Sequence, residues 1–166
     1  MISIVIPAHN EGAVVERCLR AMTADASPGE FEVIVVCNGC SDDTAARARA
    51  FGADVRVLET DVASKSHALN LGGEAATGFP RFYVDADVIL SSASIRRVAE
   101  MLDEGPVLAA APRLEVDLRD RAWPMRAYHE IWMRLPYVQE KMLGSGVYAL
   151  SRKGRERFTR FPDIIA

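Results

Sequence analysis

Short apolar segments alternate along the chain with segments whose apolar residues recur at helical spacing. Several of the apolar segments are apolar at consecutive positions, which is typical of strands buried on both faces of a sheet. Alternation of such strands with helices is the pattern of an α/β sandwich around a mostly parallel sheet, and we predict that fold class. The predicted strands are residues 2–7, 31–37, 54–58, 81–85, 107–111 and 147–150.

The helical segments lie between these strands. We predict them around residues 14–22, 41–52, 66–76, 92–104 and 124–135. Ser41 is the expected N-cap of the second helix, because Asp42 and Asp43 then place negative charge in its first turn. The last helix has an apolar stripe that we expect to be buried. The residues of this stripe are Met125, Tyr128, Ile131, Trp132 and Leu135.

Composition limits the class of protein. The 166 residues are 49% hydrophobic and 26% charged, with a net charge of −3, so we expect one folded domain over residues 1–166 and no general affinity for nucleic acid. The longest apolar runs, residues 33–37 and 107–111, are far shorter than the about 20 residues of a bilayer-spanning helix. The N-terminus also has no secretory signal. We therefore expect no membrane-spanning segment and a cytoplasmic location.

Polar residues gather in the loops that follow three of the predicted strands. These loops are residues 8–11, 38–43 and 85–87. In open α/β sheets, ligands bind at the carboxyl ends of the strands, where such loops converge. We therefore expect the functional site at this edge of the sheet.

Asp85 and Asp87 stand one residue apart where a buried strand reaches the surface, with Ala86 between them. Carboxylate oxygens suit Mg²⁺ or Mn²⁺, and a metal held by one or two carboxylates commonly completes its shell with substrate phosphates. A pair of this kind also arises by chance, and the plain alternative is a loop that caps a helix while Asp87 meets solvent. Its place at the end of a strand favours the metal site.

Four other side chains suit a nucleotide. A base could stack on His9, while Glu11 could bind ribose or simply cap a helix. Asn38 offers the donor and acceptor that the edge of a nucleobase requires, although it could merely form the turn before Gly39. Lys65 could neutralise a diphosphate or be solvated. The residues alone leave these alternatives open.

Cys37 and Cys40 form a CxxC pair between a strand and a helix, where thioredoxin-like redox pairs lie. The apolar run before Cys37 and the acidic residues after Cys40 disfavour a thiolate, and a zinc site would need more ligands. Together with Cys18, these cysteines are too few for a disulfide framework, so we expect all of them to be free.

The ordered motifs resemble those of the family 2 glycosyltransferases. The motifs are SIVIPAHNE at residues 3–11, FEVIVV at 31–36, NGCSDDT at 38–44, KSHALNLG at 65–72 and DAD at 85–87. The resemblance covers residues 2–87, with a looser continuation over residues 144–152. It implies a GT-A fold, a Rossmann-like three-layer sandwich with a mostly parallel central sheet. It also implies a nucleotide-diphosphate sugar as donor, Mg²⁺ or Mn²⁺ as cofactor and an unknown acceptor.

Carried over by position, the resemblance also assigns roles to residues. Asp87 and Asp85 would hold the metal, with Asp85 alternatively facing the ribose. An acceptor hydroxyl would then attack the sugar with inversion, assisted by a carboxylate base. The nucleotide sugar would lie against Pro7, Ala8, His9, Glu11, Asn38, Lys65, Asp85 and Ala86.

The sequence departs from the family pattern in two places. The family usually has an aspartate where Cys37 stands and often another at Asn38, so the resemblance does not extend to recognition of uracil. The base of inverting members is an acidic residue downstream of the Asp-x-Asp motif, where this chain offers Asp163 near its end. We expect the base beyond Ala166, in a longer parent protein, and assign no catalytic residue.

Two other classes of function compete with a transferase. One is a donor-binding or interaction domain without turnover, and the other is a thiol redox protein. The redox hypothesis requires a Cys37–Cys40 disulfide that forms reversibly and a depressed thiol pKa. The acceptor, the sugar and the oligomeric state cannot be read from the sequence.

Overall fold

The computed structural model describes residues 1–103, 105–113, 115, 118, 122–135 and 146–163. Its strands are β1 (Ile2–Ala8), β2 (Phe31–Asn38), β3 (Val55–Thr60), β4 (Arg81–Val84), β5 (Ala109–Ala110) and β6 (Val147–Leu150). Its helices are α1 (Val15–Thr23), α2 (Thr44–Arg49), η1 (Gly52–Asp54, a 3₁₀ turn), α3 (Lys65–Ala75), α4 (Ser92–Asp103), α5 (Trp123–Met133) and α7 (Arg152–Arg155).

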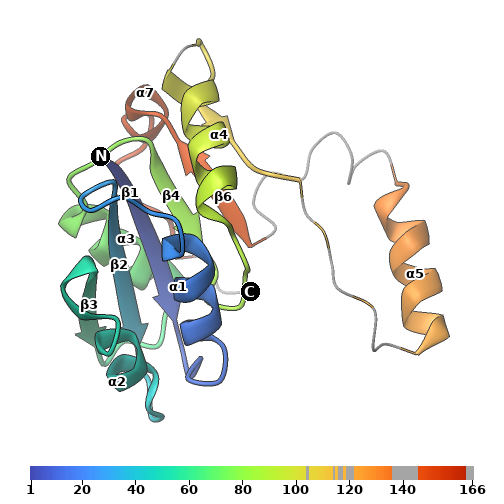
Figure 1. Ribbon diagram of the computed structural model, residues 1–166, viewed down its shortest axis with the longest axis horizontal. Coiled ribbons are helices and arrows are strands. Elements are labelled where there is room, and N and C mark those ends of the chain that lie inside the picture. The colour runs from blue at the N-terminus through green and yellow to red at the C-terminus, as the bar shows by residue number, and fades with distance from the viewer. Residues whose placement is uncertain (104, 114, 116–117, 119–121, 136–145, 164–166) are drawn as a thin grey trace.

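The strands form one mixed sheet in the order β3-β2-β1-β4-β6-β5. The pairs β2–β3, β1–β2 and β1–β4 are parallel, whereas β6 runs antiparallel to both β4 and β5. Helices α1, α2 and α4 pack on one face and α3 packs on the other (Figure 1). The predicted α/β sandwich with a mostly parallel sheet is therefore confirmed.

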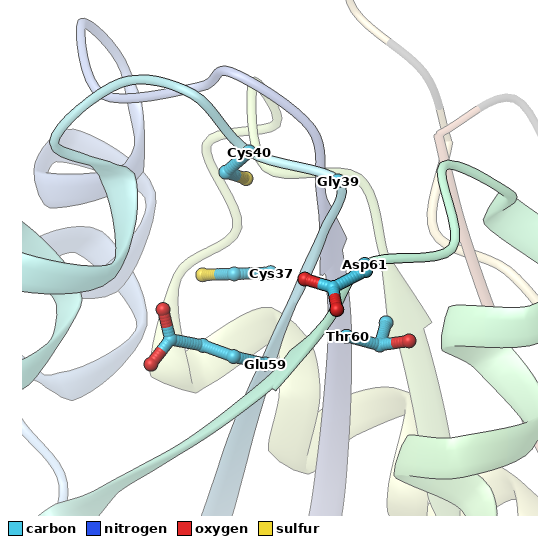
Figure 2. A pocket seen from close by; sticks show the side chains of 6 residues that line it. All are labelled: Cys37, Gly39, Cys40, Glu59, Thr60 and Asp61. Carbon is cyan, nitrogen blue, oxygen red and sulfur yellow. The ribbon is translucent and has the colours of Figure 1, made fainter.

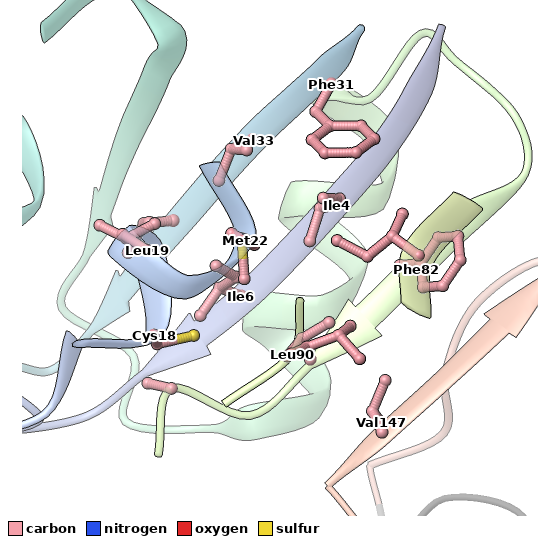
Figure 3. Close-up of a cluster of buried hydrophobic side chains, with 14 of the residues drawn as sticks. Ile4, Ile6, Cys18, Leu19, Met22, Phe31, Val33, Phe82, Leu90 and Val147 are labelled. Carbon is pink, nitrogen blue, oxygen red and sulfur yellow. The ribbon is translucent and has the colours of Figure 1, made fainter. Parts of the chain in front are cut away.

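The central strands are buried on both faces. Ile4 and Ile6 pack against α1, while Val5 points to the opposite face and contacts the α3 side, and all three are fully buried. Figure 3 shows the cluster on the α1 side, where Leu19 and Met22 of α1 lie over the strands. This two-sided burial explains why the strands are apolar at consecutive positions.

Helix α2 begins later than the sequence suggests, and the Ser41 prediction is wrong. The helix starts at Thr44, with Asp43 as its N-cap residue. Ser41 is occupied elsewhere, because its N–H donates to Asn10 Oδ1 over 2.8 Å. Asp42 Oδ1 instead accepts from the Thr44 N–H over 3.1 Å, so a turn built on Asp42 leads into the helix.

The apolar stripe of α5 is largely exposed, which contradicts its predicted burial. Tyr128 and Ile131 are 65% and 66% exposed, and Met125 and Leu135 are also exposed, whereas Trp132 is half-buried. Figure 1 shows α5 apart from the sandwich. Helical periodicity correctly indicates an amphipathic helix, but it carries no information about what covers the apolar face.

Candidate nucleotide-binding edge of the sheet

The parallel strands β1, β2 and β4 end at the same edge of the sheet. In the register, Ala8 of β1 lies opposite Cys37 of β2, and Val5 lies opposite Tyr83 of β4. The loops that follow these strands therefore start side by side. They are the three loops that the sequence singled out.

The loop after β1 is attached to the loop after β2 by side-chain contacts. His9 Nδ1 lies 2.6 Å from the carbonyl oxygen of Asn38. The Cys40 thiol donates to Ala8 O over 3.3 Å, and its sulfur accepts from the Asn10 N–H over 3.4 Å. Asn10 has a φ of +55°, which asparagine tolerates better than most residues.

The same attachment continues into the start of α1. The Glu11 N–H donates to Thr44 Oγ1 over 2.8 Å, and the Gly12 N–H donates to Asp42 Oδ2 over 3.0 Å. Hydrogen bonds lower the pKa of the Asp42 carboxyl; the hydroxyl of Thr44 contributes most, and the N–H groups of Gly12 and Thr44 add to it. A Cβ at Gly12 would lie 2.4 Å from Asp43 Oδ1 and 2.9 Å from Asp42 Oδ2, so the two loops approach closely here and a side chain at this position would have to displace these carboxylates. The loop that carries His9 and Glu11 is therefore held in place from one end to the other.

Asp85 follows β4 and is tied to its surroundings through its backbone and side chain. Its N–H donates to Gly146 O over 2.7 Å, which links it to the chain entering β6. One of its carboxylate oxygens lies 2.6 Å from Nζ of Lys65, the first residue of α3. The predicted diphosphate-binding lysine and the predicted metal-binding aspartate are therefore in contact.

Negative charge collects at this edge. The pKa of Glu11 is raised, first by partial burial and then by the carboxylates of Asp87, Asp42 and Asp85, against a smaller opposing effect of His9. A cation placed among these carboxylates would relieve their mutual repulsion. Within the described ranges, no three or more His, Cys, Asp or Glu side chains form a cluster able to hold a metal by themselves. Carboxylate oxygens are nevertheless the type of ligand that a hard divalent cation takes, and such a cation commonly completes its shell with substrate phosphates.

The remaining predicted residues differ in what they can offer a ligand. His9 and Asp87 are exposed, and the Lys65 side chain is 60% exposed. Asn38 is buried, at 4% exposure. Three positions face the interior, which leaves mainly backbone atoms for a ligand; they are Pro7, Ala8 and Ala86.

Asp163 lies beyond a segment that is anchored on the other face of the sheet. The Asn70 side chain of α3 donates to Phe161 O over 3.0 Å and accepts from the Phe161 N–H over 2.7 Å. The Phe161 ring meets Tyr83 and Tyr148 edge-on. Asp163 itself is exposed.

A small polar cavity lies beside the loop after β2. Figure 2 shows its lining, which is Cys37, Gly39, Cys40, Glu59, Thr60 and Asp61. The contribution of β3 and of the loop after it was not foreseen from the sequence, because these residues match none of the motifs. The available signal is the run of three polar residues, Glu59, Thr60 and Asp61, that directly follows the predicted strand 54–58.

The Cys37 thiol of this cavity does not have the property that the redox hypothesis requires. Cys18, Cys37 and Cys40 are all free, as expected. Burial, followed by the neighbouring Cys40, raises the pKa of the Cys37 thiol to about 12. The depressed pKa that the redox hypothesis requires is therefore contradicted at Cys37.

The structure also bears on membrane insertion. Among the helices of the described ranges, none is long and apolar enough to cross a bilayer.

Comparisons with known proteins show the family of this chain. The sequence matches the family model described as Glycosyl transferase family 2 over residues 3–155. Glycosyltransferase AglE of Haloferax volcanii is 34% identical in an alignment 91 residues long, and the alignment covers 52% of this chain and 30% of AglE.

Two solved structures share the architecture. The mannosyltransferase PcManGT of Pyrobaculum calidifontis, in complex with GDP-Man and Mn²⁺, aligns with a TM-score of 0.75 and 22% identity over 98% of this chain and 47% of its own. Glucosyl-3-phosphoglycerate synthase of Mycobacterium tuberculosis, in complex with Mg²⁺ and UDP, aligns with a TM-score of 0.67 and 25% identity over 92% of this chain and 57% of its own. The GT-A sandwich implied by the sequence motifs is confirmed.

This chain spans between 30% and 57% of the length of these proteins. The family model, in contrast, extends over most of the chain and includes every loop of the candidate site. The chain belongs to the family 2 glycosyltransferases, a family of enzymes that transfer sugars.

Proposed function

We propose that this chain binds a nucleotide-diphosphate sugar at the carboxyl edge of its sheet and transfers the sugar to an acceptor hydroxyl with the help of a divalent metal. The observation that carries the proposal is the meeting of the Lys65 ammonium with Asp85, beside Asp87 and Glu11, at the end of the parallel strands. Carboxylates and an ammonium in one place suit a diphosphate and its counter-ion. The nucleotide sugars and metals bound by PcManGT and by the mycobacterial synthase are in keeping with it.

The loop after β1 would receive the nucleoside. His9 Nδ1 faces the carbonyl oxygen of Asn38, so this nitrogen donates and the contact orients the ring. The exposed ring offers a flat surface on which a base can stack. Glu11 would accept from ribose hydroxyls, while Asn38, Pro7, Ala8 and Ala86 would line the nucleotide through polar or backbone atoms.

Asp85 and Asp87 would hold Mg²⁺ or Mn²⁺, the metal implied by the family. When bound, the metal would neutralise charge on the diphosphate leaving group. The chain's own contribution is to fix the position of Asp85, through its bond to Gly146, and to bring Lys65 to the same place.

In the proposed transfer, the oxygen of the acceptor hydroxyl bonds to the anomeric carbon as the bond from that carbon to the diphosphate breaks. The nucleoside diphosphate leaves, and a carboxylate base takes the hydroxyl proton. Attack opposite the leaving group inverts the anomeric centre. Asp163 is the carboxylate near the end of the chain, and no base is assigned.

Binding of UDP and GDP, measured by calorimetry with and without Mn²⁺, tests the proposal. We expect binding of at least one nucleotide to require the metal and to weaken about tenfold or more in Asp87→Asn, because the variant removes a charged ligand. Asp54→Asn is the matched control, since Asp54 is exposed and lies at the opposite end of the sheet, before β3.

Binding that is independent of metal, or equally weakened by both substitutions, contradicts the proposed site. Incubation with nucleotide sugars and candidate acceptors then tests turnover. Donor binding without hydrolysis or transfer would favour the donor-binding domain over the enzyme.

A further inference from the structure

Lys65 provides Asp85 with a positive charge before any ligand is present. Its Nζ lies 2.6 Å from Asp85 Oδ1, although the two residues come from different elements, the start of α3 and the end of β4. Within the described ranges, Lys65 is the ion-pair partner of Asp85. The pair is partly open to solvent, with the two side chains 60% and 34% exposed.

The surroundings of the pair favour a cation. Asp85 lies in a region of negative charge, because the carboxylates of Asp87, Asp42 and Asp85 each act on the carboxyl of Glu11. The Lys65 backbone is fixed, because it follows Ser64, whose side chain caps α3 by accepting from the His67 N–H over 3.2 Å. The ammonium, in contrast, is a compact charge at the end of a flexible stem and can change partners.

We propose that Lys65 is the resident counter-cation of Asp85, that it competes with the divalent metal for this carboxylate, and that the arriving diphosphate draws it away. This inference rests on the proposed function, since it concerns the same site. It makes Lys65 a positioning residue that keeps Asp85 paired while the site is empty and releases it when nucleotide binds.

The exchange couples the binding of metal and nucleotide. Without nucleotide, the metal has to displace the ammonium from Asp85, which lowers its affinity. With nucleotide, the phosphate oxygens offer Lys65 another partner, and Asp85 becomes free. By linkage, the metal strengthens nucleotide binding by the same factor as the nucleotide strengthens metal binding.

Titration of Mn²⁺ alone, followed by electron paramagnetic resonance of the free ion, tests the competition. We expect Lys65→Met to bind Mn²⁺ about two- to fivefold more tightly than the unchanged protein, the factor that a partly exposed ion pair typically represents. Lys65→Arg keeps the positive charge and should behave as the unchanged protein. Lys153→Met, which removes an exposed lysine of α7, is the matched control.

Equal or weaker Mn²⁺ binding by Lys65→Met, including no detectable binding by either protein, overturns the inference. Thermal unfolding of each variant shows whether it is folded. A second arm measures UDP and GDP in the presence of Mn²⁺, where Lys65→Met should bind the accepted nucleotide more weakly.

The two arms separate this inference from the proposed function. Failure of the unchanged protein to bind either nucleotide contradicts the function, while the comparison of Mn²⁺ affinities needs no nucleotide. Tighter metal binding together with unchanged nucleotide binding overturns the exchange of Lys65 between Asp85 and the diphosphate.

Discussion

Cys40 joins the two loops of the site through its thiol, which contacts both Ala8 O and the Asn10 N–H. The sequence offers a cysteine pair and suggests redox or metal chemistry for it. In the structure, Cys40 instead has a structural role, because its thiol is a hydrogen-bond donor and acceptor for the loop that carries His9. A cysteine in this place is small enough for the loops to approach and still polar enough to satisfy both backbone groups.

Replacement of Cys40 by alanine tests this structural role. Cys40→Ala removes both contacts, so we expect nucleotide affinity to fall about two- to tenfold, in line with about 0.5–1.5 kcal/mol for a hydrogen bond. Cys40→Ser keeps a donor and an acceptor and should recover part of the loss. Calorimetric titration of both variants measures the nucleotide affinity. Identical affinities for Cys40→Ala and the unchanged protein would show that the thiol does not position the loop.

At the scale of elements, α3 and the central strands are fitted closely together. A Cβ built on Gly72 would lie 2.4 Å from Val5 Cγ1, so the helix rests directly on β1. At the next position, a Cβ on Gly73 would have its nearest neighbour, Tyr83 Oη, at 3.5 Å, an ordinary contact. Because Lys65 is the first residue of α3, the distance between α3 and the sheet affects where the Lys65 ammonium lies relative to Asp85.

The two glycines provide a matched pair of substitutions. We expect Gly72→Ala to reduce the free energy of unfolding by about 1–3 kcal/mol, the usual cost of overpacking. Gly73→Ala should be neutral or slightly stabilising, since alanine favours helix. Denaturant unfolding of both variants measures the difference, and similar stabilities would contradict the close packing of α3 on β1.

A second link between elements joins α4 to the turn before β2. Arg96 donates to both carboxylate oxygens of Glu30 and to Asp25 O. The hydrogen bonds from Arg96 to the carboxylate, followed by one from the Ser27 N–H, lower the pKa of Glu30 from 4.5 to about 2. The charged form of Glu30 is therefore favoured in the folded state.

The sign of the resulting pH dependence follows from the lowered pKa. Glu30 contributes stability above its unfolded value of 4.5, and this contribution is lost as the pH falls toward about 2. Glu30→Gln should therefore be less stable than the unchanged protein at pH 6, and the difference should shrink as the pH falls from 4.5 toward 2. Thermal melting of both proteins across this pH range measures the difference in stability. A difference that does not depend on pH would contradict the ion pair.

Local patterns in the sequence predict some elements well and others poorly. The buried strands and the helices α1, α3 and α4 are predicted to within a few residues, because their apolar spacing directly reflects burial against the sheet. The start of α2 is mispredicted because Ser41 bonds Asn10, which lies 31 positions earlier. Contacts of this kind have no local signal.

At the scale of the whole molecule, the site depends on segments far apart in the chain. The sequence predicts that the loops after β1, β2 and β4 meet, since parallel strands end at one edge. It does not predict that β6 returns antiparallel to β4, which brings Gly146 to Asp85, or that Lys65 reaches the same carboxylate. The candidate residues could thus be named in advance, while their pairing required the fold.

A crystal structure with UDP or GDP and Mn²⁺, in which anomalous scattering locates the metal, is the most direct measurement. We expect Mn²⁺ on the carboxylates of Asp85 and Asp87, the diphosphate beside Lys65, and the base against the His9 loop. A nucleotide bound elsewhere, or a metal that touches neither aspartate, would contradict the assignment of this edge as the donor site.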